Sequence, residues 1–230
     1  SKKRKNRDIK FLIFHYTGMK SEIAALKKLT NIQSQVASHY FIKKNGEVLT
    51  LVPDSYVAWH AGISAWKNFT SLNKNSIGIE ISNPGHQFGY KKFSKKQINS
   101  LIRLSKFLIK KYKIKKSNIL GHSDIAPDRK KDPGEKFPWK IMSKKKIGIW
   151  HNLNSMKLKK FRRKKCNKKS SNKFTNNLLR IGYSSNNQNK ISKSKYITFL
   201  IKSFQRRYRP ELINGKIDHE CLLISENLTK

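Results

Sequence analysis

The stretch FLIFH, residues 11–15, decides the fold, because four apolar residues run directly into a histidine. Such a short apolar run is typical of a buried strand, and the polar residue is expected where the strand leaves the sheet. SIGIEIS, residues 76–82, alternates and is rich in isoleucine, which predicts another strand. NIL, residues 118–120, predicts a short strand that leads into a polar segment, GHSDIAPDRKKDPG, residues 121–134.

Helices and a hairpin separate these strands. SEIAALKKL, residues 21–29, predicts a short helix with Ser21 as N-cap. The segment 37–52 holds two strand-like runs around Asn45-Gly46, a strong hairpin signal. From Ser94 to Tyr112 apolar residues recur at helical spacing. The pattern predicts an α/β domain over residues 1–150, with a mixed central β-sheet flanked by helices.

The chain changes character after residue 150. Nine of the thirteen positions 157–169 are Lys or Arg, so residues 151–175 are expected to form a basic linker. Helical periodicity returns near Leu178, and one apolar face recurs over residues 197–208. The tail predicts a turn and a last short helix. Residues 176–230 are therefore expected to form a small all-α C-terminal domain.

Composition bounds the class of protein. Hydrophobic residues make up 37% of the 230, which suffices for a packed core and argues against global disorder. A net charge of +39 predicts nonspecific binding to polyanions. A lysine-, asparagine- and isoleucine-rich composition also fits an AT-rich coding sequence, which would raise lysine without any ligand. Specific nucleic-acid binding is not expected, because Phe161 is the one aromatic residue in the basic run 157–169.

Further features concern compartment and assembly. Cys166 and Cys221 are too few for a disulfide framework and are expected to be unpaired thiols. No apolar run approaches the roughly 18 residues of a membrane span. The first ten residues are charged and lack the apolar part of a signal peptide, although a processed chain would look the same. We expect a monomer.

Two histidines follow strand-like runs, His15 after FLIF and His122 after NILG. Strand ends present side chains to a crevice, and a catalytic zinc usually takes three protein ligands from histidine and carboxylate. An aspartate of the segment 121–134 would complete such a set. Asp132 is favoured, because the proline after it holds it extended, which turns Lys130 and Asp132 to the same side.

The same pattern suggests a hydrolase. Zinc lowers the pKa of bound water toward neutrality, a lysine such as Lys130 can stabilise an oxyanion, and a general base completes the set. Glu80 is the best candidate base, because it lies inside an apolar strand. The alternatives remain open: surface or core histidines, a turn aspartate at 132, one lysine among many at 130, and a solvent-facing Glu80.

Five motifs carry a family resemblance: FHYTG, SHYFIKKNGEV, AWHAGISAW, LNKNSIGIEI and GHSDIAPDRKKDPG with FPW after it. Over about residues 9–150 the chain resembles the zinc N-acetylmuramoyl-L-alanine amidases, the group related to peptidoglycan recognition proteins. It looks most like the AmiD type, which adds a C-terminal helical peptidoglycan-binding domain. FQRRYRPELINGKIDHE, residues 204–220, is similar to a pattern of that domain.

The resemblance implies a reaction and its residues. These enzymes hydrolyse the amide between N-acetylmuramic acid, or its anhydro form, and L-alanine of the stem peptide. Carried over, the Zn²⁺ ligands are His15, His122 and Asp132. Glu80 takes the position of the general base that acts on the zinc-bound water, and Lys130 that of the oxyanion-stabilising residue.

The resemblance also has a departure. Ser38 stands where some relatives carry a catalytic tyrosine, so more weight falls on Glu80. Asp132 indicates the carboxylate branch rather than relatives that use a cysteine ligand. His60 and Trp59 are candidates to line the substrate groove, and Arg129 to pair with a muropeptide carboxylate. Structural or solvent-facing roles for these three side chains remain the alternative.

The resemblance implies peptidoglycan or muropeptides as partners. A wall-remodelling enzyme would work in the bacterial cell envelope or periplasm, and the extra C-terminal domain favours this location. A recycling enzyme would work in the cytoplasm. The competing function is a non-catalytic peptidoglycan-recognition protein, although relatives that lose catalysis typically lose a zinc ligand, and all three candidate ligands stand in this sequence.

Overall fold

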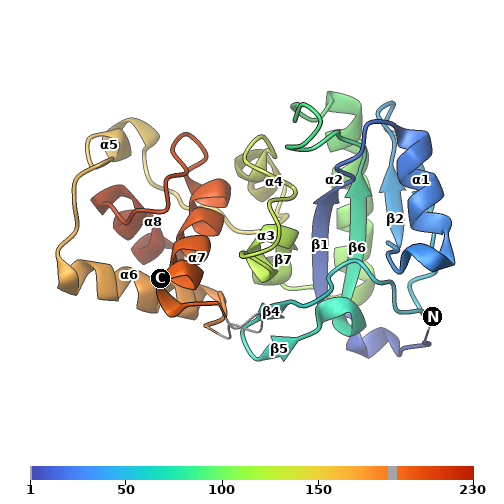
Figure 1. The fold of residues 1–230 in the computed structure, drawn as a ribbon, viewed down its shortest axis with the longest axis horizontal. Helices are drawn as coiled ribbons and strands as arrows, with labels where there is room; N and C mark the ends of the chain where they lie inside the picture. Colours follow the sequence, from blue (N-terminus) through green and yellow to red (C-terminus); the bar gives the residue numbers. More distant parts are fainter. Residues whose placement is uncertain (1, 186–190) are drawn as a thin grey trace.

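The structure, a computed structural model, describes residues 2–185 and 191–230. Residue 1 and residues 186–190, which belong to the predicted domains 1–150 and 176–230, lie outside the described residues. A five-stranded sheet forms one half of the molecule and helices form the other half (Figure 1).

The sheet is mixed, with the order β3-β2-β6-β1-β7. Strands β2, β6, β1 and β7 are parallel, and β3 pairs antiparallel with β2. A separate two-stranded sheet joins β4 and β5. The strand bounds are β1 Phe11–Tyr16, β2 Tyr40–Ile42, β3 Val48–Thr50, β4 Ala65–Trp66, β5 Phe69–Thr70, β6 Ser76–Ile81 and β7 Ile119–Gly121.

Eight α-helices and four short 3-10 helices lie in the described residues. The α-helices are α1 Glu22–Thr30, α2 Lys95–Tyr112, α3 His122–Ile125, α4 Trp139–Lys144, α5 Ser155–Lys159, α6 Lys168–Ile181, α7 Lys193–Tyr208 and α8 His219–Leu228. The 3-10 helices are η1 Asn6–Asp8, η2 Ile32–Ser34, η3 Leu72–Asn75 and η4 Lys116–Asn118.

The predicted fold class is confirmed. The strands expected at 11–15, 76–82 and 118–120 are β1, β6 and β7, and the hairpin around Asn45-Gly46 joins β2 to β3. Both predicted N-caps form: Ser21 accepts a hydrogen bond from the backbone N–H of Ala24, and Ser94 accepts one from that of Gln97. These local signals were sufficient because each acts within one turn of the chain.

Alternate residues of β1 point to two different cores. Leu12 and Phe14 pack with α2 on one face of the sheet. Phe11 and Ile13 pack on the other face into a cluster that also contains side chains of α6, α7 and α8. The C-terminal helices therefore complete the hydrophobic core beside the β7 edge, where Figure 1 shows them.

The segment 151–175, predicted as a basic linker, contains α5 and the first half of α6. Helix α5 begins after Asn154, whose side chain accepts hydrogen bonds from two backbone N–H groups. Leu158 of α5 is buried in the C-terminal core. Among residues 2–185 and 191–230, no helix combines the length and the apolar character that a membrane crossing requires. Cys166 and Cys221 are both free thiols.

Candidate active site

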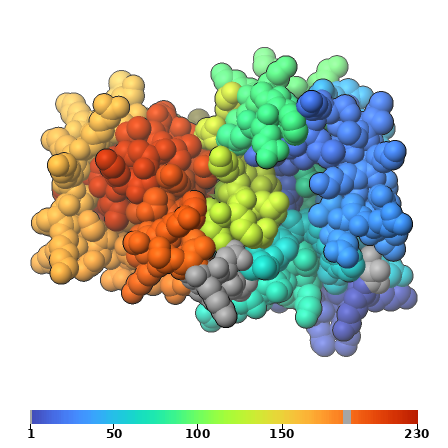
Figure 2. Space-filling view, in the orientation of Figure 1, coloured from blue at the N-terminus to red at the C-terminus, as the bar shows by residue number. Residues whose placement is uncertain are grey.

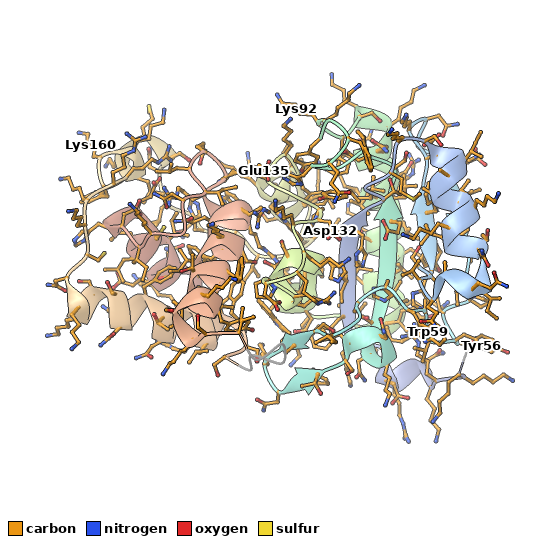
Figure 3. All side chains as sticks on the ribbon, viewed as in Figure 1. Tyr56, Trp59, Lys92, Asp132, Glu135 and Lys160 are labelled. Carbon is orange, nitrogen blue, oxygen red and sulfur yellow. The ribbon has the colours of Figure 1, made fainter. Side chains whose placement is uncertain are left out.

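Three side chains from the carboxyl ends of β1 and β7 and the loop after α3 converge. The Nδ1 atoms of His15 and His122 lie 3.0 Å apart, and Asp132 Oδ2 lies 2.9 Å from the first and 3.0 Å from the second. All three residues are at least 94% buried. Figure 3 shows Asp132 at the centre of the molecule, between the sheet and the C-terminal helices. The structure therefore brings together the three side chains that the sequence analysis grouped.

Burial and mutual proximity shift the pKa values of this group. Burial, with the adjacent charge of His122, lowers the pKa of His15 to about 4. Burial alone would raise the pKa of Asp132, but the neighbouring His122 and His15 outweigh it and hold that pKa well below its usual range. Asp132 is therefore a carboxylate and His15 a neutral imidazole at neutral pH, the protonation states that a metal requires of such ligands.

This donor set fits a zinc ion. Two imidazole nitrogens and one carboxylate oxygen are the ligands that catalytic zinc takes in several hydrolases. Tetrahedral ligands at about 2.0–2.1 Å from zinc lie roughly 3.3 Å from one another, close to the 2.9–3.0 Å spacing of these atoms. Within the described part of the chain this is the one cluster of histidine, cysteine and acidic side chains with such geometry.

Glu80 lies beside the cluster. Its position on β6 pairs with that of His15 on β1. Its Oε2 atom is buried and has no hydrogen-bond partner among the described residues. Burial, together with the negative charge of Asp132, raises the pKa of Glu80 to about 8, while the charge of Lys130 opposes the shift. An acid in a cleft that has a buried carboxyl oxygen and a strongly raised pKa is typical of a functional group.

A cavity of about 390 Å³ opens over these residues. Seven of the eight residues that the sequence analysis singled out line this cavity: Trp59, His60, Glu80, His122, Arg129, Lys130 and Asp132. The eighth, His15, does not line it. Trp59 is 49% exposed at this cavity. Figure 2 shows the yellow-green segment around residues 121–135 on the surface, between the orange C-terminal helices and the blue N-terminal region.

Two of these side chains also make contacts that the sequence did not indicate. The Arg129 guanidinium donates hydrogen bonds to the backbone carbonyls of Ala61 and Ile63. His60 is only 8% exposed, and its Nδ1 lies 3.0 Å from His15 Nε2. Burial first, then the adjacent charge of His15, lowers the pKa of His60 well below its ordinary value.

Ser38 and His39 form hydrogen bonds outside the metal cluster. The buried Ser38 hydroxyl donates to the backbone carbonyl of Tyr40, two residues along. His39 accepts a hydrogen bond from the backbone N–H of Gly78, and its other ring nitrogen lies 2.7 Å from the Arg4 guanidinium.

Sequence reasoning missed two groups of residues near the site. Tyr16 and His86 line the cavity and are joined by a 2.8 Å hydrogen bond, and His86 Nε2 lies 3.1 Å from Glu135. The second group is Asp124 with Arg207, a buried ion pair between α3 and α7. Both groups join residues far apart in the chain, and no local pattern announces such pairs.

Comparison with known proteins agrees with this geometry. The family described as N-acetylmuramoyl-L-alanine amidase matches residues 5–135. The N-acetylmuramoyl-L-alanine amidase AmiD of Escherichia coli is 37% identical over 232 residues, which cover 96% of this chain and 82% of that protein. The 1,6-anhydro-N-acetylmuramyl-L-alanine amidase AmpD of the same organism is 37% identical over 98 residues, 43% of this chain and 51% of that protein.

Solved structures extend the likeness over nearly the whole chain. E. coli AmiD in complex with the substrate anhydro-N-acetylmuramic acid-L-Ala-D-γ-Glu-L-Lys matches with a TM-score of 0.82 at 36% identity, over 96% of this chain and 88% of that one. AmpDh3 of Pseudomonas aeruginosa in complex with anhydromuramic pentapeptide matches with a TM-score of 0.82 at 28% identity, over 99% and 93%.

Proposed function

This chain belongs to the N-acetylmuramoyl-L-alanine amidase family and is a hydrolase of that kind, and on that premise we propose its substrate, metal and catalytic residues. The substrate is a muropeptide or peptidoglycan, cut between N-acetylmuramic acid, or its anhydro form, and L-alanine. The observation that carries the proposal is the convergence of His15, His122 and Asp132 on one point beneath an open cavity. Two similar enzymes were solved with anhydromuramyl peptides, which supports the anhydro form.

We propose that His15, His122 and Asp132 hold Zn²⁺. When bound, zinc would polarise the amide carbonyl and lower the pKa of a water molecule beside it. The buried positions of the three ligands support a fixed geometry, because their side chains have little room to move. Residues around the ligands must then supply proton transfer and charge stabilisation.

Glu80 is proposed as the general base. Its carboxyl lines the same cavity as His122 and Asp132, and its Oε2 atom has no hydrogen-bond partner in the described part of the chain, so it can accept the proton of the attacking water. Lys130 is proposed to stabilise the negative charge that develops on the carbonyl oxygen. Its positive charge also lowers the pKa of Glu80, which favours the carboxylate form that a base needs.

The wall of the cavity is proposed to hold the substrate. Trp59 offers an exposed aromatic face, which suits stacking on a sugar ring. Arg129 carries a charge that suits a muropeptide carboxylate, and His60 also lines the cavity. The helices of residues 176–230 are proposed as a peptidoglycan-binding module and residues 151–175 as a basic connection to it. We propose that the protein works as a monomer in the cell envelope, with a cytoplasmic recycling role as the alternative.

The test joins metal content to activity. Zinc would be quantified in purified protein, and peptide release from anhydro-muropeptides would be followed by mass spectrometry. We expect one zinc per chain and cleavage before L-alanine, with both lost in Asp132→Ala and under a chelator. Asp128→Ala, a carboxylate of the same loop outside the metal cluster, is the matched control and should keep both.

The other outcomes separate the alternatives. Stoichiometric zinc with muropeptide binding and no cleavage would assign a recognition protein instead of an enzyme. Cleavage that persists without zinc would overturn the metal assignment.

A further inference from the structure

His60 occupies a place on the sheet that only a glycine leaves open. Its ring lies directly over Gly78 of β6, where an added Cβ would stand 2.4 Å from the ring carbon Cγ. In this position, Nδ1 of His60 lies within hydrogen-bond distance of His15, and Nε2 of His60 lies within that distance of Ser76. The absence of a side chain at 78 therefore fixes where the His60 ring can lie.

A chain of hydrogen bonds determines which nitrogen of each ring carries the proton. The Ser76 hydroxyl donates to the backbone carbonyl of Leu72, at 2.6 Å. Its single proton is thus used, so at 3.2 Å it accepts the proton of His60 Nε2. The Nδ1 of His60 is then an acceptor, and it takes the Nε2 proton of His15 at 3.0 Å. His15 is left with a lone pair on Nδ1, the atom that faces Asp132.

Ala61, the residue after His60, determines in the same way which nitrogen of His122 carries the proton. The backbone carbonyl of Ala61 lies 3.1 Å from His122 Nε2, and a carbonyl can only accept. His122 therefore carries its proton on Nε2 and also presents the lone pair of Nδ1 to the cluster. Arg129 donates to the same carbonyl at 3.2 Å and helps to hold it in place.

One side chain anchors this pair of residues. Asn73 Oδ1 accepts the backbone N–H groups of His60 and Ala61, at 3.1 and 2.7 Å. It lies in η3, the turn before β6, so the anchor belongs to the same structural unit as Gly78 and Ser76. The positions of both ring partners thus depend on a single amide.

We propose that the dipeptide His60–Ala61, held by Asn73, is a positioning element that sets the tautomer and orientation of both histidine ligands. Three acceptor atoms, two Nδ1 and one carboxylate oxygen, then converge on one point, an arrangement that a cation relieves. Partners of this kind typically change metal affinity about 10- to 100-fold when they are removed. The inference rests on the metal site proposed above.

The test compares side chains that keep or lose one acceptor. In His60→Asn the amide oxygen can stand where Nδ1 stood, whereas His60→Leu offers no acceptor. We expect the zinc dissociation constant, measured by competition with a chromophoric chelator, to rise about 10- to 100-fold in His60→Leu and to stay near wild type in His60→Asn. His151→Leu, at a buried histidine outside the metal cluster, is the control and should leave zinc affinity unchanged.

A second pair and a spectroscopic readout complete the design. Asn73→Asp keeps the Oδ1 acceptor and should retain zinc affinity, while Asn73→Ala should lose it. If His60→Leu does not fold, this pair of variants provides the test instead. Nitrogen-15 NMR of the zinc-loaded wild type should show His15 and His122 protonated on Nε2. The chelator assay is independent of catalysis.

The outcomes distinguish this inference from the proposed function. Wild type that binds no zinc would overturn both. Wild type that binds zinc, with equal affinity in a folded His60→Leu and in Asn73→Ala, would overturn the positioning role alone. A proton on Nδ1 of either ligand would also overturn it.

Discussion

His15 and Glu80 occupy paired positions on the adjacent parallel strands β1 and β6, so their side chains project from the same face of the sheet. A candidate metal ligand and a candidate base are thus held by a hydrogen-bonded ladder rather than by a loop. The sheet keeps the Oε2 atom of Glu80 buried with no hydrogen-bond partner among the described residues, which costs stability and is typical of a functional group.

Glu80→Gln should separate catalysis from metal binding. The amide keeps the size of the carboxyl but cannot take a proton, so we expect peptide release to fall about 10²- to 10⁴-fold. Zinc content should stay at the wild-type level, because Glu80 is not in the ligand cluster. Glu47→Gln, an exposed carboxyl on the hairpin, should leave the rate unchanged. A wild-type rate in Glu80→Gln would remove Glu80 from the mechanism.

Glu80 should also make the metal-free protein less stable as pH rises. Its carboxyl has an ordinary pKa of 4.5 when unfolded and a pKa raised to about 8 by burial in the folded state. Between these values the folded state holds a proton that the unfolded chain has lost, so the free energy of unfolding falls as pH rises. The slope from this one group approaches about 1.4 kcal/mol per pH unit.

Urea unfolding of chelator-treated wild type and Glu80→Gln between pH 6 and 9 measures this effect. The stability difference, wild type minus variant, should decline up to about pH 8 and level off above it, since Glu80 is then ionised in both states. Groups common to both proteins cancel in the difference. A difference that is flat from pH 6 to 8 would contradict a raised pKa.

Lys130→Met should slow the chemical step more than it weakens substrate binding. Loss of one oxyanion-stabilising group typically lowers kcat about 10²- to 10³-fold, with a much smaller change in KM. Lys144→Met is the control, because that exposed lysine lies on α4 and does not line the cavity. Steady-state kinetics on a purified muropeptide would measure both. A pure KM effect would reassign Lys130 to binding.

Arg207→Met should destabilise the whole protein. The Arg207 guanidinium pairs with Asp124 and donates to the backbone carbonyl of Ile119, and both charged side chains are almost fully buried. Leaving Asp124 buried and unpaired should cost about 3–5 kcal/mol. Chemical unfolding would measure it, with Arg180→Met on the exposed face of α6 as control, expected within about 0.5 kcal/mol of wild type. Equal effects of the two substitutions would refute the role of the pair.

Much of the fold could be predicted because its signals are local. The apolar run 11–15, the Asn45-Gly46 turn and the caps Ser21 and Ser94 each act over a few residues, and each formed as expected. The candidate ligands could also be predicted, because parallel strands end at one edge of the sheet and so bring His15 and His122 together. Asp132 was favoured among the three aspartates of the segment 121–134 because a proline follows it, and the family resemblance indicated the same residue.

The remainder depends on contacts between distant segments. The Ala61 carbonyl contacts His122, and the His60 ring packs on the backbone of Gly78. Both contacts depend on where the backbone lies, which a pattern of side chains in the sequence does not reveal. The two-residue strands β4 and β5 are too short for periodicity to reveal them. The predicted division at residue 150 follows composition, whereas the hydrophobic cluster formed by Phe11 and Ile13 continues into α6, α7 and α8.

The contact between α3 and α7 also limits which substitutions this sequence can accept during evolution. The Ser203 hydroxyl donates to the backbone carbonyl of Ser123 at 2.6 Å, and Arg207 stacks over Trp139 while it pairs with Asp124. Asp124 lies two residues after His122 on α3, so a substitution at 207 should disturb the helix that carries this candidate ligand. Natural variants should therefore exchange positions 124 and 207 together, and lineages that lose the arginine should also lose the aspartate.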